Sequence, residues 1–467
     1  MPCRFLSFCI CIRPFLYCVP QRSYTGCFLN FLLSHPQKTK YLLARRIPLN
    51  ILLINHYAGS PQLGMEYRPW YLAKEWVKQG HSVTIVAASF SHLRMCQPKV
   101  TRACTTSTED GIRIVWLKTP AYTGNGVRRI ANMLSFILQL YRFLPRIAKE
   151  CHLNAVIASS TYPLDAYPAH WIAQKTGAQF VFELHDLWPM SPMLLGNYKP
   201  THPFIRIMQR AENYWCRNAD KVISLLSEAS PHLQQHGLDP TKFFCVPNGI
   251  MPEEWANTDN ILPNEYQKVL DTLHSANKFC VGYAGGHAKS NALESLLAAA
   301  QILQQKNKAV HFILLGDGTE KAHLQHMAKD FNLNNTTFLP PLPKLNVPCF
   351  LKQMDVLFAG GDRRCAPLYS SGLALNKLFD YMMASKPVIL AFGDIPSIVK
   401  SSGCGYSVQC EEPESISNAI LKLWNTPPEA RQLMGERGKE YVLNHHAYPI
   451  LAQQFMDALQ INHNIVL

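Results

Sequence analysis

The chain has 467 residues, 48% of them hydrophobic and 16% charged, so it is long enough for two cores and too apolar for a disordered protein. Its net charge is +13, but no basic run with interleaved aromatic residues appears, which argues against a nucleic-acid partner. None of its 15 cysteines forms a Cys-x-x-Cys pair, which argues against a structural zinc motif and favours free thiols in a reducing compartment such as the cytoplasm.

Residues 1–48 are expected to form an extension outside the fold, or to follow from a start codon assigned too far upstream. Their apolar stretches are interrupted by Arg13, Pro14, Pro20 and Arg22. None of the stretches approaches the ~20 residues needed to span a bilayer. No small-residue cleavage site of a signal peptide is present either. A cationic membrane tether is the alternative interpretation.

From residue 49, apolar runs of strand length alternate with amphipathic helical windows. The first half predicts strands near 50–54, 82–88, 112–117, 155–159, 179–183, 221–225 and 243–246, with helices near 67–79, 128–150, 166–176, 203–218 and 228–236. The second half predicts strands near 279–284, 310–315, 336–339, 355–359, 387–391 and 405–409, again with helices between them.

Such alternation, occurring twice, predicts an α/β protein with two Rossmann-like doubly wound domains. The first domain is expected at 49–250 and the second at 278–446, with a linker region at 251–277. The amphipathic segment 447–467 is expected to form a helix that packs back across the junction.

The stretch 127–149 carries five basic residues and no acidic one, with apolar residues near helical spacing. A basic amphipathic helix can lie on an anionic lipid surface. A buried crossover helix with a solvated basic face is an equally good interpretation. The pattern leaves both open.

In open α/β sheets, ligands bind beyond the carboxyl ends of the strands. His185-Asp186 follows the strand 179–183 and precedes Trp188-Pro189, which makes this turn a candidate site. The loop after the first strand contains Gly59, Gly64, Glu66 and Arg68, and the last two can also cap the next helix.

The strongest pattern lies at 371–389. There a loop with Gly372 opens a helix that carries Lys377 and Asp380 and leads directly into a strand. Backbone N–H groups at such a helix start bind phosphate, Lys377 can add a positive charge, and Asp380 is suited to accept ribose hydroxyls. A plain βαβ crossover with a capped helix is the alternative. Gly316-Asp317-Gly318 has Lys321 where a dinucleotide fingerprint has its third glycine, which disfavours a dehydrogenase.

Segment 371–389 resembles the retaining GT-B glycosyltransferases of family four, in which a Glu-x7-Glu motif grips the donor. The resemblance runs from residue 50 to about 460. Its opening, 55–61 with 64–68, looks closest to bacterial O-antigen and exopolysaccharide enzymes of the L-fucosamine transferase type. Asp380 matches the motif's second acid, which binds the ribose in the family, whereas Gly372 stands in place of the first acid.

The resemblance also implies roles for further residues. On the donor side these are Gly285, Gly286, Lys289, Gly316, Gly372, Leu375, Asn376 and Lys377. Lys289 is a displaced counterpart of a family lysine, and Gly286 stands where the family often has arginine. His185 and Asp186 are implied to be catalytic, near the reacting sugar. Gly59, Gly64, Glu66 and Arg68 are implied to lie on the acceptor side.

The implied reaction transfers a sugar, with retention and without a metal or other cofactor, from a nucleotide diphosphate donor expected to be a UDP-sugar. An N-acetylated amino or deoxy sugar is among the candidates. The implied acceptor is a polyprenyl-diphosphate-linked saccharide at the inner membrane face, where an anionic lipid surface is a further partner. Two alternatives stay open. One is a GT-B-fold sugar-nucleotide epimerase, and the other is a nucleotide-binding partner subunit without turnover, which the missing first acid allows.

Overall fold

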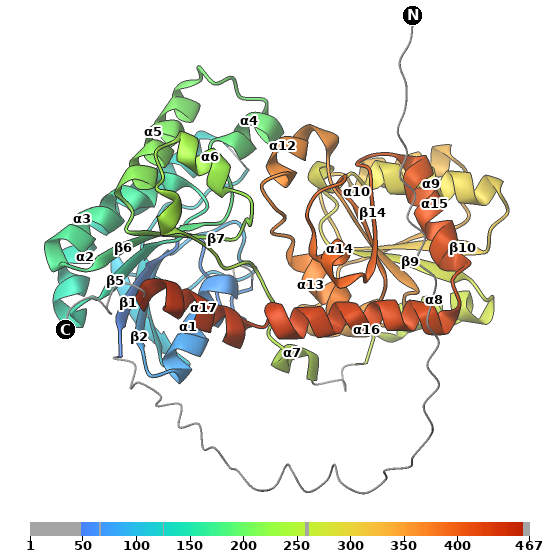
Figure 1. The fold of residues 1–467 in the computed structure, drawn as a ribbon, viewed down its shortest axis with the longest axis horizontal. Helices are drawn as coiled ribbons and strands as arrows, with labels where there is room; N and C mark the ends of the chain where they lie inside the picture. The colour runs from blue at the N-terminus through green and yellow to red at the C-terminus, as the bar shows by residue number, and fades with distance from the viewer. Residues whose placement is uncertain (1–47, 65–66, 125, 257–260, 461–467) are drawn as a thin grey trace, which may run out of the picture. The chain divides into compact units, whose positions relative to one another are not determined.

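The computed structural model describes residues 48–64, 67–124, 126–256 and 261–460, which form two α/β units built on separate sheets (Figure 1). The first sheet has the strand order β3-β4-β2-β1-β5-β6-β7-β8 and is parallel except for β3. Its strands are β1 (Asn50–Ile54), β2 (Ser82–Ala88), β3 (Cys104–Glu109), β4 (Ile112–Leu117), β5 (Ala155–Ala158), β6 (Gln179–Leu184), β7 (Lys221–Ser224) and β8 (Phe243–Cys245).

Both faces of this sheet are buried, which is why its central strands read as continuous apolar runs. In β1, Leu52 and Ile54 enter the core under one face, and Ile51 and Leu53 enter the core under the other. The helices that cover the two faces are α1 (Tyr67–Lys78), α2 (Val127–Cys151), α3 (Ala166–Thr176), α4 (Met190–Gly196), α5 (Pro203–Asn218) and α6 (Ser230–Gln235).

The second sheet is wholly parallel, with the order β11-β10-β9-β12-β13-β14. Its strands are β9 (Phe279–Ala284), β10 (Val310–Leu315), β11 (Thr336–Leu339), β12 (Val356–Gly360), β13 (Val388–Ala391) and β14 (Gly405–Val408). Its helices are α8 (Asn264–Ser275), α9 (Leu293–Gln305), α10 (Lys321–Asp330), α11 (Val347–Leu351), α12 (Ala366–Tyr369), α13 (Asn376–Met383), α14 (Ile398–Ser402), α15 (Pro413–Trp424) and α16 (Pro428–His445). The chain order reverses between β9 and β12, and this reversal is where such sheets bind ligands.

The two-sheet architecture confirms the predicted fold class, but one edge strand and the helices of the predicted linker were not anticipated. Strand β3 pairs antiparallel with β4 at the sheet edge, and its polar sequence carries no apolar run. The predicted linker 251–277 contains α7 (Glu253–Ala256) and α8. Helix α8 buries Tyr266 and Leu270 in the core of the second sheet, so it belongs to that sheet.

The chain crosses between the two units twice, and the crossings lie side by side. The Ile250 N–H donates to the His446 carbonyl (2.9 Å), and the Tyr448 N–H donates to the Ile250 carbonyl (3.0 Å). A Cβ on Gly249 would lie 2.0 Å from the His446 carbonyl oxygen, so this close approach requires glycine.

After the second crossing, α17 (Tyr448–Gln460) packs on α1 of the first sheet, which confirms the expected C-terminal helix (Figure 1). The Trp76 indole N–H donates to the Ala452 carbonyl (3.2 Å). The Trp76 and Phe455 rings meet edge to face, with centroids 5.0 Å apart. Because α16 packs on α13 and α14, one helical pair contacts both units.

Removal of the buried Phe455 ring tests how strongly α17 stabilises the fold. We expect Phe455→Ala to lower the free energy of unfolding of the first unit by about 3–5 kcal/mol, because the ring is fully buried against Trp76. Urea unfolding followed by Trp fluorescence measures the change. Gln454→Ala, at an exposed position of the same helix, should shift stability by less than about 0.5 kcal/mol. Equal unfolding midpoints for both variants would contradict this packing role.

Candidate functional site

Two glycine loops meet at the carboxyl ends of β9 and β10. The Gly285 N–H donates to the Leu315 carbonyl (3.0 Å), and a Cβ on Gly316 would lie 2.0 Å from the Gly285 carbonyl oxygen. Both glycines have positive φ, +149° and +142°. The loops therefore pack backbone on backbone, and the contact leaves no space for a Cβ on Gly316.

The amine of Lys377 lies against these loops. Its Nζ donates to Asn291 Oδ1 (2.6 Å) and to Tyr283 Oη (3.0 Å), and it lies 4.6 Å from the centre of the Tyr283 ring. A Cβ on Gly285 would be 3.5 Å from Nζ. Burial lowers the pKa of Lys377 to about 8. The ion pairs among the described residues do not include it, so this partly buried cation is held only by neutral oxygens and an aromatic face, which favours an anionic ligand.

Lys377 belongs to the first turn of α13, whose backbone adds further donors. The N-cap residue, Leu375, makes no side-chain cap hydrogen bond, so the first N–H groups of α13, beginning at Asn376, have no side-chain partner there. Such groups attract anions. The preceding Gly372 has φ +119°, and a Cβ on it would lie 3.0 Å from the Ser227 nitrogen. The structure thus brings the predicted Gly285, Gly316 and Lys377 together at the start of α13.

Asp380, one turn further along α13, has a different environment. Burial raises its pKa to about 6, an effect that Lys344 opposes and Glu254 reinforces, and its carboxylate has a side-chain hydrogen bond with Trp255. Lys344 Nζ in turn lies 2.7 Å from Glu254 Oε2 and donates to Tyr71 Oη (2.7 Å) on α1. Asp380 therefore faces α7 and a cation, whereas Lys377 faces the glycine loops.

Lys289 does not contact Lys377. It lies in the 3-10 turn Lys289–Asn291 and lines a separate cavity of about 540 Å³ together with Asp362 and Arg364. The residue of this turn that reaches Lys377 is Asn291. Neither Asn291 nor Tyr283 was predicted from the sequence, because the search favoured charged and glycine positions. Their one local signal is their position, since Tyr283 lies at the carboxyl end of β9 and Asn291 lies in the 3-10 turn that follows this strand.

At the carboxyl end of β6, His185 forms part of a buried network. Its Nε2 lies 3.0 Å from Ser159 Oγ and 3.1 Å from Glu183 Oε2. Glu183 is fully buried, which by itself raises its pKa. Arg68, with Nε 2.9 Å from Oε1, and His185 nevertheless hold that pKa at about 2. A proton on His185 Nε2 satisfies the carboxylate, so Nδ1 is the nitrogen that can accept a hydrogen bond from a ligand.

Arg68 was expected on the acceptor side, but its guanidinium is buried and bonds to groups inside the protein. Besides Glu183, it donates to the carbonyls of Pro247 (2.6 Å) and Val246 (2.8 Å). Glu183, which organises this network, was not among the predicted site residues. Its sequence signal is a single acid within the apolar run of β6.

The remaining first-sheet candidates have local structural roles. Asp186 Oδ1 accepts from the Leu187 N–H (2.9 Å) and from Ser191 Oγ (2.6 Å), which fixes the turn before α4, and burial raises its pKa. Gly59 is buried, and Gly64 has φ +72° in a tight turn. Glu66 lies outside the described residues.

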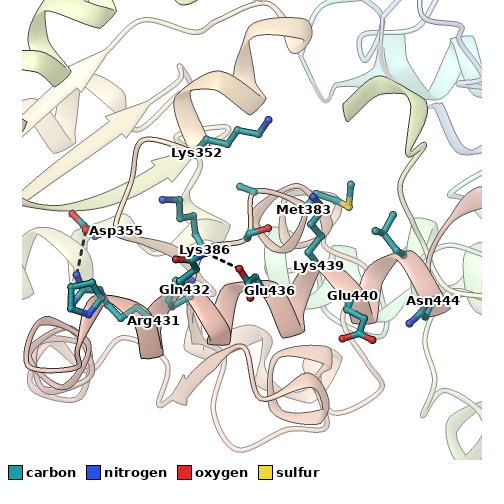
Figure 2. Close-up of a pocket in the computed structure, with 15 residues that line it drawn as sticks. Lys352, Asp355, Met383, Lys386, Arg431, Gln432, Glu436, Lys439, Glu440 and Asn444 are labelled. Carbon is teal, nitrogen blue, oxygen red and sulfur yellow. Dashed lines mark hydrogen bonds and ion pairs between the residues drawn. The ribbon is translucent and has the colours of Figure 1, made fainter. Parts of the chain in front are cut away.

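The largest of the described cavities lies at the other end of the strands of the second sheet, near their amino ends. It has a volume of about 860 Å³ and is lined by residues just before β12 and β13 and by α16 (Figure 2). Figure 2 shows Arg431 of α16 beside Asp355 at one end of it, with the ion-pair atoms 3.8 Å apart. This cavity lies at the amino ends of the strands, whereas open α/β sheets bind their ligands at the carboxyl ends. Its size therefore does not make it the ligand site of the sheet.

Comparisons with known proteins agree with the fold of two α/β units. Residues 64–249 match the model of the glycosyl transferase 4-like domain, and residues 271–441 match that of glycosyl transferases group 1. The putative colanic acid biosynthesis glycosyl transferase WcaI of Escherichia coli (strain K12) is 23% identical over 290 residues, which is 60% of this chain and 69% of WcaI.

Solved structures share the fold at low sequence identity. Anabaena HepE in complex with UDP aligns with a TM-score of 0.61 and 15% identity, over 88% of this chain and all of HepE. WaaG, a glycosyltransferase of lipopolysaccharide biosynthesis, aligns with a TM-score of 0.59 and 13% identity, over 89% of this chain and all of WaaG. With its two parallel sheets and both family domains in this order, the chain belongs to the glycosyltransferases of the GT-B fold, of the glycosyl transferase 4-like type.

Proposed function

We propose that the chain transfers a sugar from a UDP-sugar and that Lys377 and the start of α13 hold the donor diphosphate. The observation that carries this proposal is the partly buried Lys377 amine, which has neutral partners only and lies beside the loops of Gly285 and Gly316. A diphosphate supplies the negative partner that this amine lacks. The structures of HepE with UDP and of a trehalose-6-phosphate protein from E. coli bound with UDP-2-fluoro glucose, both with this fold, support the choice of nucleotide.

In the proposed reaction, the bond from the anomeric carbon to the diphosphate oxygen breaks and a bond to an acceptor hydroxyl oxygen forms on the same face. The acceptor proton passes to the departing phosphate oxygen. Lys377 and the first N–H groups of α13 stabilise the charge that develops on the diphosphate, which is electrostatic catalysis. No step requires a metal ion. His185, positioned by Glu183 and Ser159, is proposed to contact the reacting sugar through Nδ1.

The family's first motif acid is replaced by Gly372, and the packing around this position explains why glycine is needed. Its positive φ and its contact with the Ser227 backbone leave no space for a larger residue. Contacts to the donor sugar must therefore come from other groups, and His185 is the proposed one. The sugar is proposed to be an N-acetylated amino or deoxy sugar, and the acceptor a polyprenyl-diphosphate-linked saccharide of a bacterial surface polysaccharide.

Such an acceptor lies in a membrane, and α2 offers a surface suited to one. One face of α2 is buried in the first core through Phe136, Leu140 and Leu144. The opposite face exposes an apolar stripe at helical spacing, with Val127 81% and Leu138 70% exposed, and its other members are Ile130, Leu134 and Tyr141. Exposed basic residues flank the stripe: Arg128, Arg142, Arg146 and Lys149. The buried face fits the interpretation as a crossover helix, whereas the membrane interpretation concerns the exposed face and stays a proposal.

We propose that this exposed face of α2 lies on the anionic inner membrane surface, as a peripheral contact. Among the described residues, no helix has the length and apolar character needed to cross a bilayer.

The titration of Lys377 predicts how donor affinity depends on pH. With a pKa of about 8, the amine is mostly protonated at pH 7 and mostly neutral at pH 9. Because the diphosphate favours the charged form, calorimetry should show UDP affinity falling as the pH rises from 7 to 9. Lys377→Arg should flatten this dependence, since arginine stays charged. Lys377→Met should weaken UDP binding at least about tenfold at pH 7.

The matched control is Lys352→Met, which removes an exposed lysine near the amino ends of the strands of the second sheet. This variant should leave UDP affinity unchanged. If Lys377→Met and Lys352→Met bind UDP equally well, the proposed diphosphate site is wrong.

Asp380 provides a test that separates binding from folding. Asp380→Ala should weaken UDP binding at least about tenfold, because the charge-assisted hydrogen bonds to the ribose are lost. The UDP affinity of Asp380→Asn should lie between that of Asp380→Ala and that of wild type. The raised pKa of Asp380 means that its ionised form destabilises the folded protein. This cost is fully present above pH 6 and is lost as the pH falls towards 3.8. At pH 8, Asp380→Asn should therefore be at least as stable as wild type in thermal unfolding while binding UDP more weakly.

A folded Asp380→Ala protein with wild-type UDP affinity would exclude a ribose contact at this position.

The membrane contact can be measured by co-sedimentation with vesicles containing phosphatidylglycerol. Each basic residue near an anionic surface contributes about 1 kcal/mol, so Arg128→Gln with Arg142→Gln should weaken binding roughly tenfold or more. Leu138→Gln should weaken it on neutral vesicles too. The matched control, Lys352→Gln with Lys439→Gln, removes the same charge from the second sheet and should have little effect. Equal losses in both double variants would indicate unspecific attraction by net charge.

A further inference from the structure

Helices α5 and α6 bring a carboxylate and two imidazoles together outside the candidate donor site. Glu212 lies on α5, His232 lies on α6, and His236 directly follows α6. One ligand atom from each lies within 4.8 Å of the other two. The separations are 3.0 Å from His232 Nε2 to Glu212 Oε1 and 3.7 Å from His236 Nε2 to Glu212 Oε2.

The charge on Glu212 lacks a permanent counter-ion. Its side chain is only 1% exposed, and among the described residues its ion-pair partners are the two histidines. Gln209 Nε2, a neutral donor, lies 2.6 Å from Oε2. A buried carboxylate without a permanent cationic partner is costly unless a cation joins it.

The surroundings also orient His236 for ligation. Gln209 Nε2 lies 2.6 Å from Glu212 Oε2, 3.0 Å from Asn213 Oδ1 and 3.1 Å from His236 Nδ1. His236 Nδ1 lies 2.9 Å from Asn213 Oδ1, an acceptor, so the tautomer with the proton on Nδ1 satisfies this contact. In that tautomer the Nε2 lone pair of His236 faces the Glu212 carboxylate, 3.7 Å from Oε2. Metal-bound histidines are typically held in this way, through the other ring nitrogen.

We propose that Glu212, His232 and His236 bind a zinc ion, with the fourth position taken by water. Two imidazoles and one carboxylate are a ligand set that zinc uses when one position stays open, whereas magnesium and calcium prefer oxygen ligands alone. Zinc–ligand distances of about 2.0–2.2 Å at tetrahedral angles place neighbouring ligand atoms ~3.3 Å apart. The two observed separations, 3.0 Å from His232 to Oε1 and 3.7 Å from His236 to Oε2, lie on either side of that value, each at a different oxygen of the Glu212 carboxylate.

The ion would stabilise a wall of the candidate donor site without taking part in the transfer. Helix α6 follows the loop 225–229, in which the Glu228 N–H donates to the Ser371 carbonyl (2.9 Å) and Ser227 contacts Gly372. Joining α6 to α5 through a metal fixes this loop against the segment before α13. The inference does not depend on the proposed donor, because zinc affinity is measured without nucleotide.

The test uses the full-length protein after dialysis against a chelator, with zinc titrated in competition with a chromophoric chelator. Wild type should have one zinc site that His232→Ala with His236→Ala abolishes. Asn213→Ala should weaken that site about 10–100-fold, because it removes only the residue that orients His236. Zinc should raise the thermal unfolding midpoint of wild type and leave that of the double variant unchanged.

His326→Ala is the matched control, since His326 pairs with Asp330 on the surface at 2.8 Å without a third ligand, and it should keep the site. Cobalt in place of zinc distinguishes this site from cysteine ligation, which adds a thiolate charge-transfer band. Equal zinc affinity and stoichiometry in wild type and the double variant would overturn the proposal, as would a thiolate band at the one site of wild type. If the double variant does not fold, unchanged zinc affinity in both Asn213→Ala and Glu212→Gln would overturn it equally.

Discussion

The ion pair between Arg68 and Glu183 is the interaction on which the arrangement of the first unit depends. It joins α1 to β6 in the buried interior, and the same guanidinium donates to Val246 and Pro247, where the chain leaves the first sheet. Removing one partner would leave the other charge buried and uncompensated, which usually costs several kcal/mol. Because Glu183 also contacts His185, the interaction that fixes the chain crossing also sets the orientation of the candidate catalytic histidine.

The second unit solves the opposite electrostatic problem. Its partly buried cation, Lys377, has no carboxylate partner among the described residues and is held by Tyr283 and Asn291. A carboxylate there would stabilise the empty protein but would compete with an anionic ligand for the amine. Neutral oxygens satisfy the donor hydrogens and leave the charge available. The contrast between a compensated arginine in one unit and an uncompensated lysine in the other is what assigns the donor to the second sheet in our proposal.

Contacts of the linking segment and of α1 with the second unit surround Asp380. Glu254 of α7 and Tyr71 of α1 share Lys344, and Asp380 lies close enough to respond to both charges of this cluster. If Asp380 binds the donor ribose, as we propose, the bound donor lies next to a cluster to which residues of both units contribute.

The sequence by itself determined the two-sheet fold, its strands and the C-terminal helix, because apolar periodicity is a local property that each segment carries alone. It also identified the glycine loops and Lys377, since strand ends and helix starts are marked locally. Tertiary structure alone decided which groups meet. Lys377 hydrogen-bonds to Tyr283 and Asn291, which are distant in sequence. Lys289 lines a separate cavity, and Arg68 forms a buried ion pair with Glu183. Strand β3 and helix α8 escaped prediction because a polar edge strand and a helix within a polar stretch gain their stability from the neighbours they pack on. Hydrogen-bond partners depend on which loops the fold brings together, and no local pattern encodes that.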